Sequence, residues 1–588
     1  MNVEPLGQLA RTHTCGQLSA ADAGQSVVLL GWIHRVRDLG GVLFFDLRDR
    51  HGLTQVVVRD EALAEQAKRL RPEFVVGVTG RVDLRDKAAV NPKLPTGEVE
   101  VAADQVRLLN DAKTPPFPIN EDAPISEDIR LKYRYLDLRK PKLQHNMMLR
   151  HRAAFEIRRY FDENGFLEVE TPILTKSTPE GARDYLVPSR VHPGEFYALP
   201  QSPQIFKQIL MISGLDRYFQ IVKCFRDEDL RADRQPEFTQ VDLEISFATE
   251  NLVFAILEPL MARLMGLIGR DAPHPFRRMA YAEAIAKYGS DKPDLRVGME
   301  LRDLSDPFRA SNFSVFRGAL DTGGEVRGIV VPGGAKYSRK DLDNLAEEAK
   351  QLGAAGLVWA RHADASVQSS ALKAAGEDVI RQALNTACAG KDDLLLLAAG
   401  PHALTTRVLG QLRLSIAKRE NLLDPHRYEF LWVVDFPMFE WLEEDNRWEF
   451  MHHPFTAPLE SDAARLELDP GSVRARAYDL VLNGSEIGGG SIRIHDQRLQ
   501  RLVFKLLGMS DDEARLRFGF FVDALEYGTP PHGGIALGLD RIVAILAGEQ
   551  SISEVIAFPK TAQAVDLMAG APSAVNPRQL RELRIRTE

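Results

Sequence analysis

One stretch of the sequence, FRDEDLRADRQPEFTQVDLE (residues 225–244), gathers charged residues between two strand-like segments. The connection is longer than an ordinary hairpin turn and carries arginines, which bind phosphate and carboxylate groups well. Asp242 and Glu244 share one face of the second strand, where they repel each other unless a cation or a protonated ligand lies between them. The stretch is therefore a candidate site for anions and for a cation, while a solvated hairpin tip followed by an exposed strand edge is the ordinary alternative.

Three further places combine residue types that could contribute to such a site. Arg541 falls in the first turn of a predicted helix, where the helix dipole disfavours a cation unless a bound phosphate reverses the balance. Gln204 and Lys207 share one face of another predicted helix, which taken alone is typical of a solvated polar surface. Glu486 and Arg493 flank three glycines, and strict alternation puts them on opposite strand faces unless the glycines host a bulge; a glycine-rich hairpin is the ordinary alternative.

Together these residues have the chemistry to bind a triphosphate with Mg²⁺, an ammonium group and a second anion. The sequence contains neither H-E-x-x-H nor G-x-x-x-x-G-K-[ST], so zincin and P-loop chemistry are excluded. The candidates are Arg226, Arg541, Asp479 and Glu486 for the triphosphate and metal, Asp242 and Gln204 for the ammonium, and Lys207 and Arg493 for the second anion.

Several domains must position these residues, because a chain of 588 residues is too long for one hydrophobic core. We expect a multidomain α+β fold. Short strands separated by glycines over residues 1–110 predict a five-stranded OB-fold barrel, followed by a proline-rich linker or hinge at 111–142. Residues 143–296 and 422–588 carry the candidate residues and form one catalytic domain, with a helix from 143 to 164, a strand that reaches Pro172 and a helix that begins near Ser202. Residues 297–421 have mixed αβ character and read as an inserted domain.

The bulk composition restricts the class of protein. A net charge of −9 argues against a mainly electrostatic nucleic-acid binder, although residues 130–159 contain ten arginines and lysines with few acids and predict a local basic surface. The three cysteines form no C-x-x-C pair, which argues against a disulfide framework or a zinc knuckle. We find no signal-like apolar segment near the N-terminus and no apolar run of membrane-spanning length, so we expect a cytoplasmic protein without membrane contact.

Seven segments, in order, resemble those of the class II aminoacyl-tRNA synthetases, and within them the bacterial aspartate–tRNA ligases. FLEVETPIL (166–174) resembles motif 1, the dimer-forming element, while residues 225–244 resemble motif 2 and GIALGLDRI (534–542) resembles motif 3. Four more segments are similar to the substrate-pocket segments of that family: TKSTPEGARDY (175–185), QSPQIFKQ (201–208), FMHHPFTAP (450–458) and GSEIGGGSIRIH (484–495).

The resemblance implies a cytoplasmic homodimer that activates L-aspartate with ATP and Mg²⁺ and transfers it to tRNA(Asp). It also implies a class II antiparallel-sheet catalytic domain, and it makes Arg226 and Arg541 the catalytic residues. By the same resemblance, the groups that surround each ligand are Arg226, Asp227, Glu228, Gln235, Phe238, Glu486, Gly538, Leu539, Asp540 and Arg541 for ATP, Glu180, Gln204, Lys207, Arg226, Asp242, His452 and Arg493 for aspartate, and Asp479 and Glu486 for Mg²⁺.

The resemblance also makes the N-terminal barrel an anticodon-binding domain. An aliphatic residue at the position of Leu39 and a lysine at that of Lys87 go with family members that charge only tRNA(Asp), whereas histidine and glycine go with members that also charge tRNA(Asn). We therefore predict a discriminating enzyme, with a non-discriminating one as the alternative. The residues predicted to contact or select the anticodon are Arg35, Arg37, Asp38, Leu39, Phe44, Gln55, Lys87 and Asn91.

Two other functions stay open at this level. One is a related class II ligase for asparagine or lysine, against which the positive pair Lys207 and Arg493 argues, because two cations suit a carboxylate. The other is a noncatalytic relative that only binds RNA, against which the retained arginines of motifs 2 and 3 argue.

Overall fold

The computed structural model describes residues 2–120, 123–178, 182–229, 232–364 and 366–586, and the chain forms two compact units. Unit 1 comprises Met1–Met148 and Ser553–Ala574, and unit 2 comprises Leu149–Ile552 and Val575–Glu588. Helix α4 (Pro141–Glu163) runs from unit 1 into unit 2 and ends before Gly165, whose φ of 73° supplies the left-handed stop expected there. Within the described residues, we find no helix with the length and apolarity that a membrane crossing requires.

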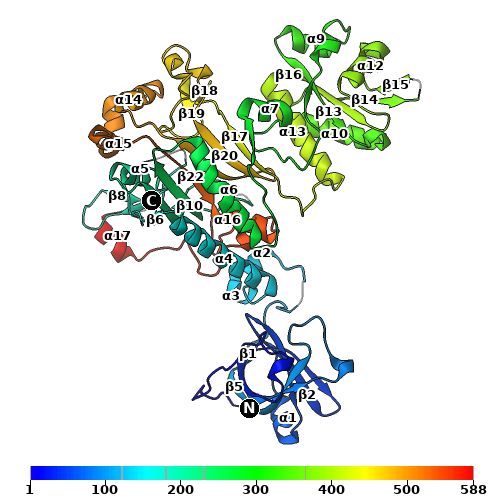
Figure 1. The fold of residues 1–588 in the computed structure, drawn as a ribbon, viewed down its shortest axis with the longest axis vertical. Coiled ribbons are helices and arrows are strands. Elements are labelled where there is room, and N and C mark those ends of the chain that lie inside the picture. Colours follow the sequence, from blue (N-terminus) through cyan, green and yellow to red (C-terminus); the bar gives the residue numbers. More distant parts are fainter. Residues whose placement is uncertain (1, 121–122, 179–181, 230–231, 365, 587–588) are drawn as a thin grey trace. The chain divides into compact units, whose positions relative to one another are not determined.

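Unit 1 contains the predicted barrel, which is confirmed as a closed five-stranded one in the order β1-β2-β3-β5-β4 (Figure 1). Alternate residues such as Leu43 and Phe45 fill its interior. At Gly80 a Cβ atom would lie 2.2 Å from the carbonyl oxygen of Ala102, so only glycine allows the close strand approach at the irregularity beside it. The elements are β1 (Ser26–Leu39), β2 (Val42–Asp49), β3 (Gly52–Val58), α1 (Glu61–Ala67), β4 (Val75–Leu84) and β5 (Val99–Asn110).

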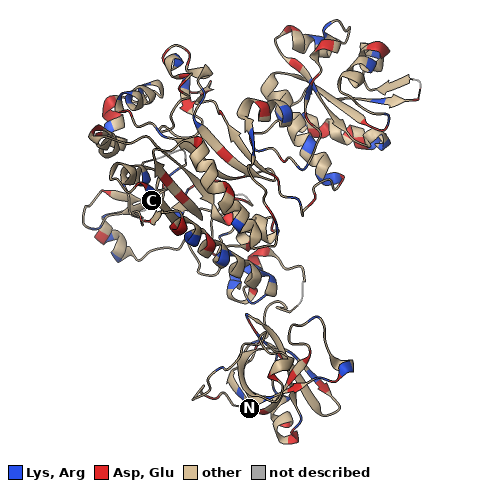
Figure 2. Ribbon diagram, viewed as in Figure 1, with Lys and Arg blue, Asp and Glu red and all other residues tan. Residues whose placement is uncertain are grey.

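The expected basic surface at residues 130–159 is wrong for most of that stretch, because acidic partners neutralise its side chains. In unit 1, α2 (Glu127–Lys132) and α3 (Arg134–Asp137) place Arg130 2.9 Å from Glu554, and the buried Arg134 contacts Asp137 at 2.9 Å. In unit 2, Arg158 of α4 pairs with Glu168 at 3.0 Å. Figure 2 shows acidic and basic residues alternating along this part of the chain.

Unit 2 is built on an eight-stranded sheet in the order β11-β17-β20-β21-β22-β10-β9-β6, antiparallel except at its two edge pairs. Helices α6 (Glu250–Gly266) and α16 (Leu539–Ala547) pack on the sheet, and Figure 1 shows them beside α4. The strands are β6 (Leu167–Glu168), β9 (Arg217–Phe225), β10 (Glu237–Ser246), β11 (Arg277–Ala280), β17 (Phe430–Val434), β20 (Ala477–Leu482), β21 (Ser485–Ile492) and β22 (His532–Gly538).

The predicted strand up to Pro172 is wrong in length, since only Leu167 and Glu168 pair as a strand. This segment lies at the edge of the sheet, where it has one neighbouring strand, and a proline offers no N–H for a ladder. Helix α5 (Gln204–Ile212) begins two residues after Ser202, whose hydroxyl accepts a hydrogen bond from the Gln204 N–H at 3.2 Å.

Residues 297–421 form the mixed αβ region that the sequence predicts, with a sheet of their own in the order β12-β13-β16-β14-β15. Its strands are β12 (Arg302–Asp303), β13 (Glu325–Val331), β14 (Val358–Ala363), β15 (Ser366–Ser369) and β16 (Leu394–Gly400). Its helices are α8 (Ser305–Arg309), α9 (Ser314–Asp321), α10 (Arg339–Gln351), α11 (Leu372–Ala375), α12 (Glu377–Thr386) and α13 (His402–Arg419).

The described residues of unit 2 also form two further hairpins and four further α-helices. The hairpins are β7 (Leu186–Pro188) with β8 (Phe196–Ala198) and β18 (Phe439–Leu442) with β19 (Arg447–Phe450). The helices are α7 (Tyr281–Tyr288), α14 (Gln497–Leu506), α15 (Asp511–Ala524) and α17 (Pro577–Leu583).

Candidate active site

A cavity of about 580 Å³ lies in unit 2 and brings most of the predicted site residues together. Asp227 and Leu539 are not among its lining residues, and Glu180 lies outside the described part of the chain. The predicted residues that line it are Gln204, Lys207, Arg226, Glu228, Gln235, Phe238, Asp242, His452, Asp479, Glu486, Arg493, Gly538, Asp540 and Arg541.

At one end of the cavity, Lys207 neutralises the repulsion between Asp242 and Glu244, the two carboxylates of β10. Its Nζ lies 3.1 Å from Asp242 and 3.3 Å from Glu244, and its side chain is 1% exposed. The prediction that the polar face of α5 is exposed to solvent is therefore wrong, because this face is buried against β10. Its lysine lies between two carboxylates that would otherwise repel each other.

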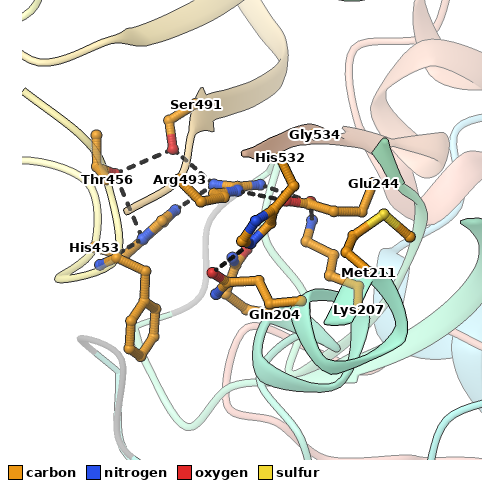
Figure 3. Close-up of polar contacts among 12 residues, drawn as sticks. Gln204, Lys207, Met211, Glu244, His453, Thr456, Ser491, Arg493, His532 and Gly534 are labelled. Carbon is orange, nitrogen blue, oxygen red and sulfur yellow. Dashed lines mark hydrogen bonds and ion pairs between the residues drawn. The ribbon is translucent and has the colours of Figure 1, made fainter. Parts of the chain in front are cut away.

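Arg493 completes a buried array of two cations and two carboxylates, of which Lys207, Arg493 and Glu244 are labelled in Figure 3. Its Nε and Nη2 donate to the two oxygens of Glu244 at 2.9 and 3.1 Å. Its Nη1 contacts neutral groups instead, Ser491 Oγ at 2.7 Å and His453 Nε2 at 2.5 Å. The four charges cancel, so Lys207 and Arg493 are not the free positive pair that the sequence suggests, and Nη1 is the nitrogen of Arg493 that faces no charge.

The electrostatics of this array follow from burial and pairing. Burial, opposed by Lys207, raises the pKa of Asp242 to about 6, and its Oδ1 is buried without a hydrogen-bond partner among the described residues. Burial also acts to raise the pKa of Glu244, but Arg493 and Lys207 outweigh it and hold that pKa below its ordinary value. Burial and the charge of Arg493 keep the pKa of His453 well below its ordinary value, so this imidazole is neutral at pH 7.

The other end of the cavity is lined by the arginines of the motif 2 and motif 3 segments. The Arg226 guanidinium lies 5.1 Å from the centre of the Phe238 ring, and its Nε is buried without a hydrogen-bond partner in the described chain. Arg541 donates to the Glu486 carbonyl oxygen and pairs with Asp233 at 3.1 Å. A buried guanidinium nitrogen without an acceptor is costly, and a bound anion would satisfy it.

Asp479 and Glu486 face each other at this end because the expected bulge is present. Leu480 pairs with Gly488 and the next pair is Val481 with Glu486, so Ile487 is the extra residue and the bulge precedes the glycines. The nearby charge of Asp479, together with burial, raises the pKa of Glu486. Two crowded carboxylates of this kind attract a cation.

The predicted anticodon residues gather on the outside of the barrel in unit 1. Arg37 pairs with Asp46 at 2.7 Å and donates to Gln55 at 3.2 Å, and Gln55 donates to Glu100 at 2.8 Å. Phe44 lies opposite Arg37 on the neighbouring strand and is half-buried outside the barrel core.

The other barrel residues lie in turns or on the surface. Asp38 accepts a hydrogen bond from the Gly41 N–H at 3.1 Å, Leu39 is 64% exposed, and Arg35 is also exposed. Lys87 begins a short 3₁₀ helix (Lys87–Ala89), and Asn91 accepts from the Lys93 N–H at 3.1 Å.

Sequence reasoning missed four residues that organise these sites. Glu244 was recognised only as a repelling neighbour of Asp242, although strand alternation already places both on one face. The family resemblance points to His452, whose Nε2 lies 3.7 Å from Asp479, whereas His453 is the histidine that contacts Arg493. Glu100 carries no signal in the sequence, because its partner Gln55 lies 45 residues away on another strand. Ser491 lies only two residues before Arg493, a spacing that strand alternation places on one face.

Comparison with known proteins identifies the family. The model described as "tRNA synthetases class II (D, K and N)" matches residues 126–562, and "OB-fold nucleic acid binding domain" matches residues 27–109. The chain belongs to the class II tRNA synthetases. The synthetase match contains every residue that lines the cavity, and the OB-fold match covers all five barrel strands except their outermost residues Ser26 and Asn110.

Relatives of this synthetase are similar over its whole length. "Aspartate--tRNA(Asp/Asn) ligase" of Caldanaerobacter subterraneus subsp. tengcongensis is 52% identical, covering 100% of both chains. "Aspartate--tRNA ligase" of Ruminiclostridium cellulolyticum is 50% identical, covering 99% of both. An asparaginyl-tRNA synthetase from Pyrococcus horikoshii, solved with asparaginyl-adenylate, has a TM-score of 0.59 at 20% identity over 94% of this chain and 99% of its own, which supports the fold.

Proposed function

We propose that this synthetase is an aspartate–tRNA ligase that converts L-aspartate and ATP to aspartyl-adenylate and pyrophosphate, and then transfers the aspartyl group to the 3′ end of tRNA(Asp). The observation that carries the proposal is the buried array of Lys207, Asp242, Glu244 and Arg493 at one end of the cavity that holds Arg226 and Arg541. The names of the full-length relatives support the same substrate.

The array offers complementary places for the charged groups of aspartate. The substrate ammonium would pair with Asp242, whose Oδ1 has no partner in the described residues. The side-chain carboxylate would bind Arg493 Nη1, replacing a contact to the neutral His453 with a charge-assisted one. Asp242 and Glu244 together balance the two cations, so one added carboxylate and one added ammonium leave the array neutral.

Adenylate formation needs positioning more than acid–base chemistry. An oxygen of the substrate α-carboxylate attacks the α-phosphorus of ATP, and the bond from that phosphorus to the bridging oxygen breaks, which releases pyrophosphate. Arg226 would neutralise the charge that builds on the α-phosphate, and Arg541 would bind the γ-phosphate, with Phe238 against the adenine.

Asp479 and Glu486 fit a Mg²⁺ ion. Asp479 Oδ1 is buried without a hydrogen-bond partner in the described chain, and a Cβ on Gly489 would lie 2.9 Å from it and 3.5 Å from Glu486 Oε1, so the glycine keeps this space open. Two carboxylates suit Mg²⁺, which keeps waters and binds substrate phosphates. When bound, the ion would neutralise phosphate charge.

Amino-acid selectivity tests the proposal directly. We expect the purified protein to exchange pyrophosphate into ATP with L-aspartate about a hundredfold or more faster than with L-asparagine or L-lysine. The reason is that an amide or an ammonium cannot give Arg493 a charge-assisted partner. Equal exchange with asparagine would overturn the assignment to aspartate.

Two tRNA specificities are candidates: charging of tRNA(Asp) alone, and charging of both tRNA(Asp) and tRNA(Asn). The exposed Leu39 offers no hydrogen bond to a mismatched base, which supports a strict tRNA(Asp) enzyme, whereas the name of the Caldanaerobacter relative supports charging of tRNA(Asn) as well. We keep the strict enzyme as our prediction and expect kcat/KM to be about ten- to a few-hundredfold higher for tRNA(Asp), a difference of only about 1.4–3 kcal/mol. Aminoacylation of the two transcripts side by side decides between them, and comparable values would establish the relaxed enzyme.

Phe44 is proposed to stack on an unpaired anticodon base, an interaction worth about 1–3 kcal/mol. Phe44→Ala is expected to raise the KM for tRNA about tenfold and to leave aspartate-dependent exchange unchanged, because it lies outside the barrel core. The adjacent Phe45→Ala is the control: it removes a fully buried core side chain and should destabilise the barrel by about 3–5 kcal/mol. Loss of stability with Phe44→Ala would make Phe44 a packing residue instead.

A cytoplasmic homodimer remains part of the proposal. Large apolar side chains are exposed on α4 and in the motif 1 segment, among them Phe155, Leu167, Ile173 and Leu174. Such a cluster is typical of a subunit interface. Light scattering on the purified protein should give twice the chain mass, and a monomer at micromolar concentration would contradict the interface.

A further inference from the structure

Arg150, near the middle of α4, contacts both the motif 2 segment and the motif 3 segment without lining the cavity. Its Nη1 pairs with Asp540 Oδ1 at 2.5 Å, and its Nη2 donates to Thr239 Oγ1 at 3.0 Å. The second oxygen of Asp540 accepts from the Thr239 N–H at 2.7 Å. Helix α4, strand β10 and helix α16 are thus fastened at one point within unit 2.

The contact of Arg150 with Asp540 and Thr239 is suited to fixing the orientation of the Asp540 side chain. A guanidinium is a planar fork, and here its two arms bind acceptors from two different elements. Asp540 is the second residue of α16, where the helix dipole favours a carboxylate. Asp540 and Thr239 are buried, so little water competes for these bonds.

Fixing Asp540 constrains its neighbour. Consecutive helical residues point about 100° apart, so when Asp540 is held toward Arg150 and Thr239, Arg541 is directed elsewhere. Arg541 reaches the cavity, where it donates to the Glu486 carbonyl oxygen and pairs with Asp233. The carboxylate of Asp540, which the family resemblance gave to ATP, is here bonded to protein groups through both oxygens.

We infer that Arg150 is a positioning residue for the ATP end of the site: it holds Asp540 and thereby aims Arg541. This inference rests on the proposed function, because its readout is adenylate formation. The aspartate end is independent of the contact, since Lys207, Glu244 and Arg493 bond to one another and not to Arg150, Asp540 or Thr239.

The test compares Arg150→Met, Arg150→Lys and the control Arg152→Met in aspartate-dependent ATP–pyrophosphate exchange. Arg152 is exposed on the same helix, so its variant should match the wild type. Arg150→Met should lower kcat about ten- to a hundredfold and raise the KM for ATP, with the KM for aspartate within twofold of wild type. Arg150→Lys should restore part of kcat, because it keeps the charge but not the fork.

A double-mutant cycle separates this role from general stability. If Arg150 acts through Asp540, then Arg150→Met with Asp540→Asn should lose no more activity than the worse single variant. Should Arg150→Met fail to fold, Thr239→Val removes only one of the two acceptors and is expected to lower kcat severalfold with the same KM pattern.

The inference is overturned if Arg150→Met behaves like Arg152→Met, if the KM for aspartate rises in parallel with that for ATP, or if the losses in the double variant multiply. These outcomes differ from failure of the proposed function, in which the wild type itself would show no aspartate-dependent exchange.

Discussion

Replacing Arg226 with alanine is expected to slow aspartate-dependent adenylate formation by about a hundredfold or more, the scale of losing one preorganised charge at a transition state. Arg226 lines the cavity, rests on the Phe238 ring and has a buried Nε that no described residue accepts from. Its side chain therefore contributes little to the fold and is available to the α-phosphate. Single-turnover measurement of adenylate formation gives the effect on the chemical step.

The controls for this prediction distinguish a catalytic arginine from a structural one. Lys223→Ala removes an exposed cation on the neighbouring strand β9 and should leave the rate unchanged. Arg226→Lys should recover only part of the activity, because an ammonium cannot make the bidentate contact. If Arg226→Ala melts the protein while its specific activity stays intact, the arginine is structural and our assignment is wrong.

Replacing Glu244 with glutamine is expected to disable aspartate binding and to destabilise unit 2 by about 3–5 kcal/mol at pH 7, the usual cost of breaking a buried ion pair from one side. Glu244 is fully buried and bonds both Arg493 and Lys207, so the neutral amide leaves two buried cations with one carboxylate. The KM for aspartate should rise about a hundredfold, since Arg493 loses the partner that orients it.

Urea unfolding followed by tryptophan fluorescence measures the stability change, because every tryptophan except Trp32 lies in unit 2. The matched control is Glu582→Gln, which breaks the exposed pair with Arg578 and should cost less than about 1 kcal/mol. A change as small as the control's would mean that Glu244 does not hold the array together.

The pH dependence of this effect has a definite sign. Arg493 and Lys207 hold the folded-state pKa of Glu244 below its unfolded value. The ionised carboxylate therefore contributes stability above the unfolded pKa, and this contribution is lost as the pH falls through the lowered folded pKa. The stability difference between wild type and Glu244→Gln should accordingly persist from pH 7 to pH 5 and shrink only in stronger acid.

The sequence by itself determined the elements and the membership of the site. Alternation and glycines placed the five barrel strands, and the sequence named fourteen residues that line one cavity, thirteen of them in the motif segments. The odd spacing of Glu486 and Arg493 called for a bulge at the glycines if both face one cleft, and the structure has the bulge just before them, at Ile487. These inferences succeed because strand and helix periodicity are local properties of the chain.

Only the tertiary structure decided how the charges are paired. Arg493 and Glu244 are 249 residues apart, Arg150 and Asp540 are 390 apart, and Arg130 and Glu554 are 424 apart. Periodicity tells which residues share a face, but it does not tell which distant face packs against it. Packing alone turned the polar face of α5 into the buried centre of the site, and the basic stretch into a set of internal ion pairs.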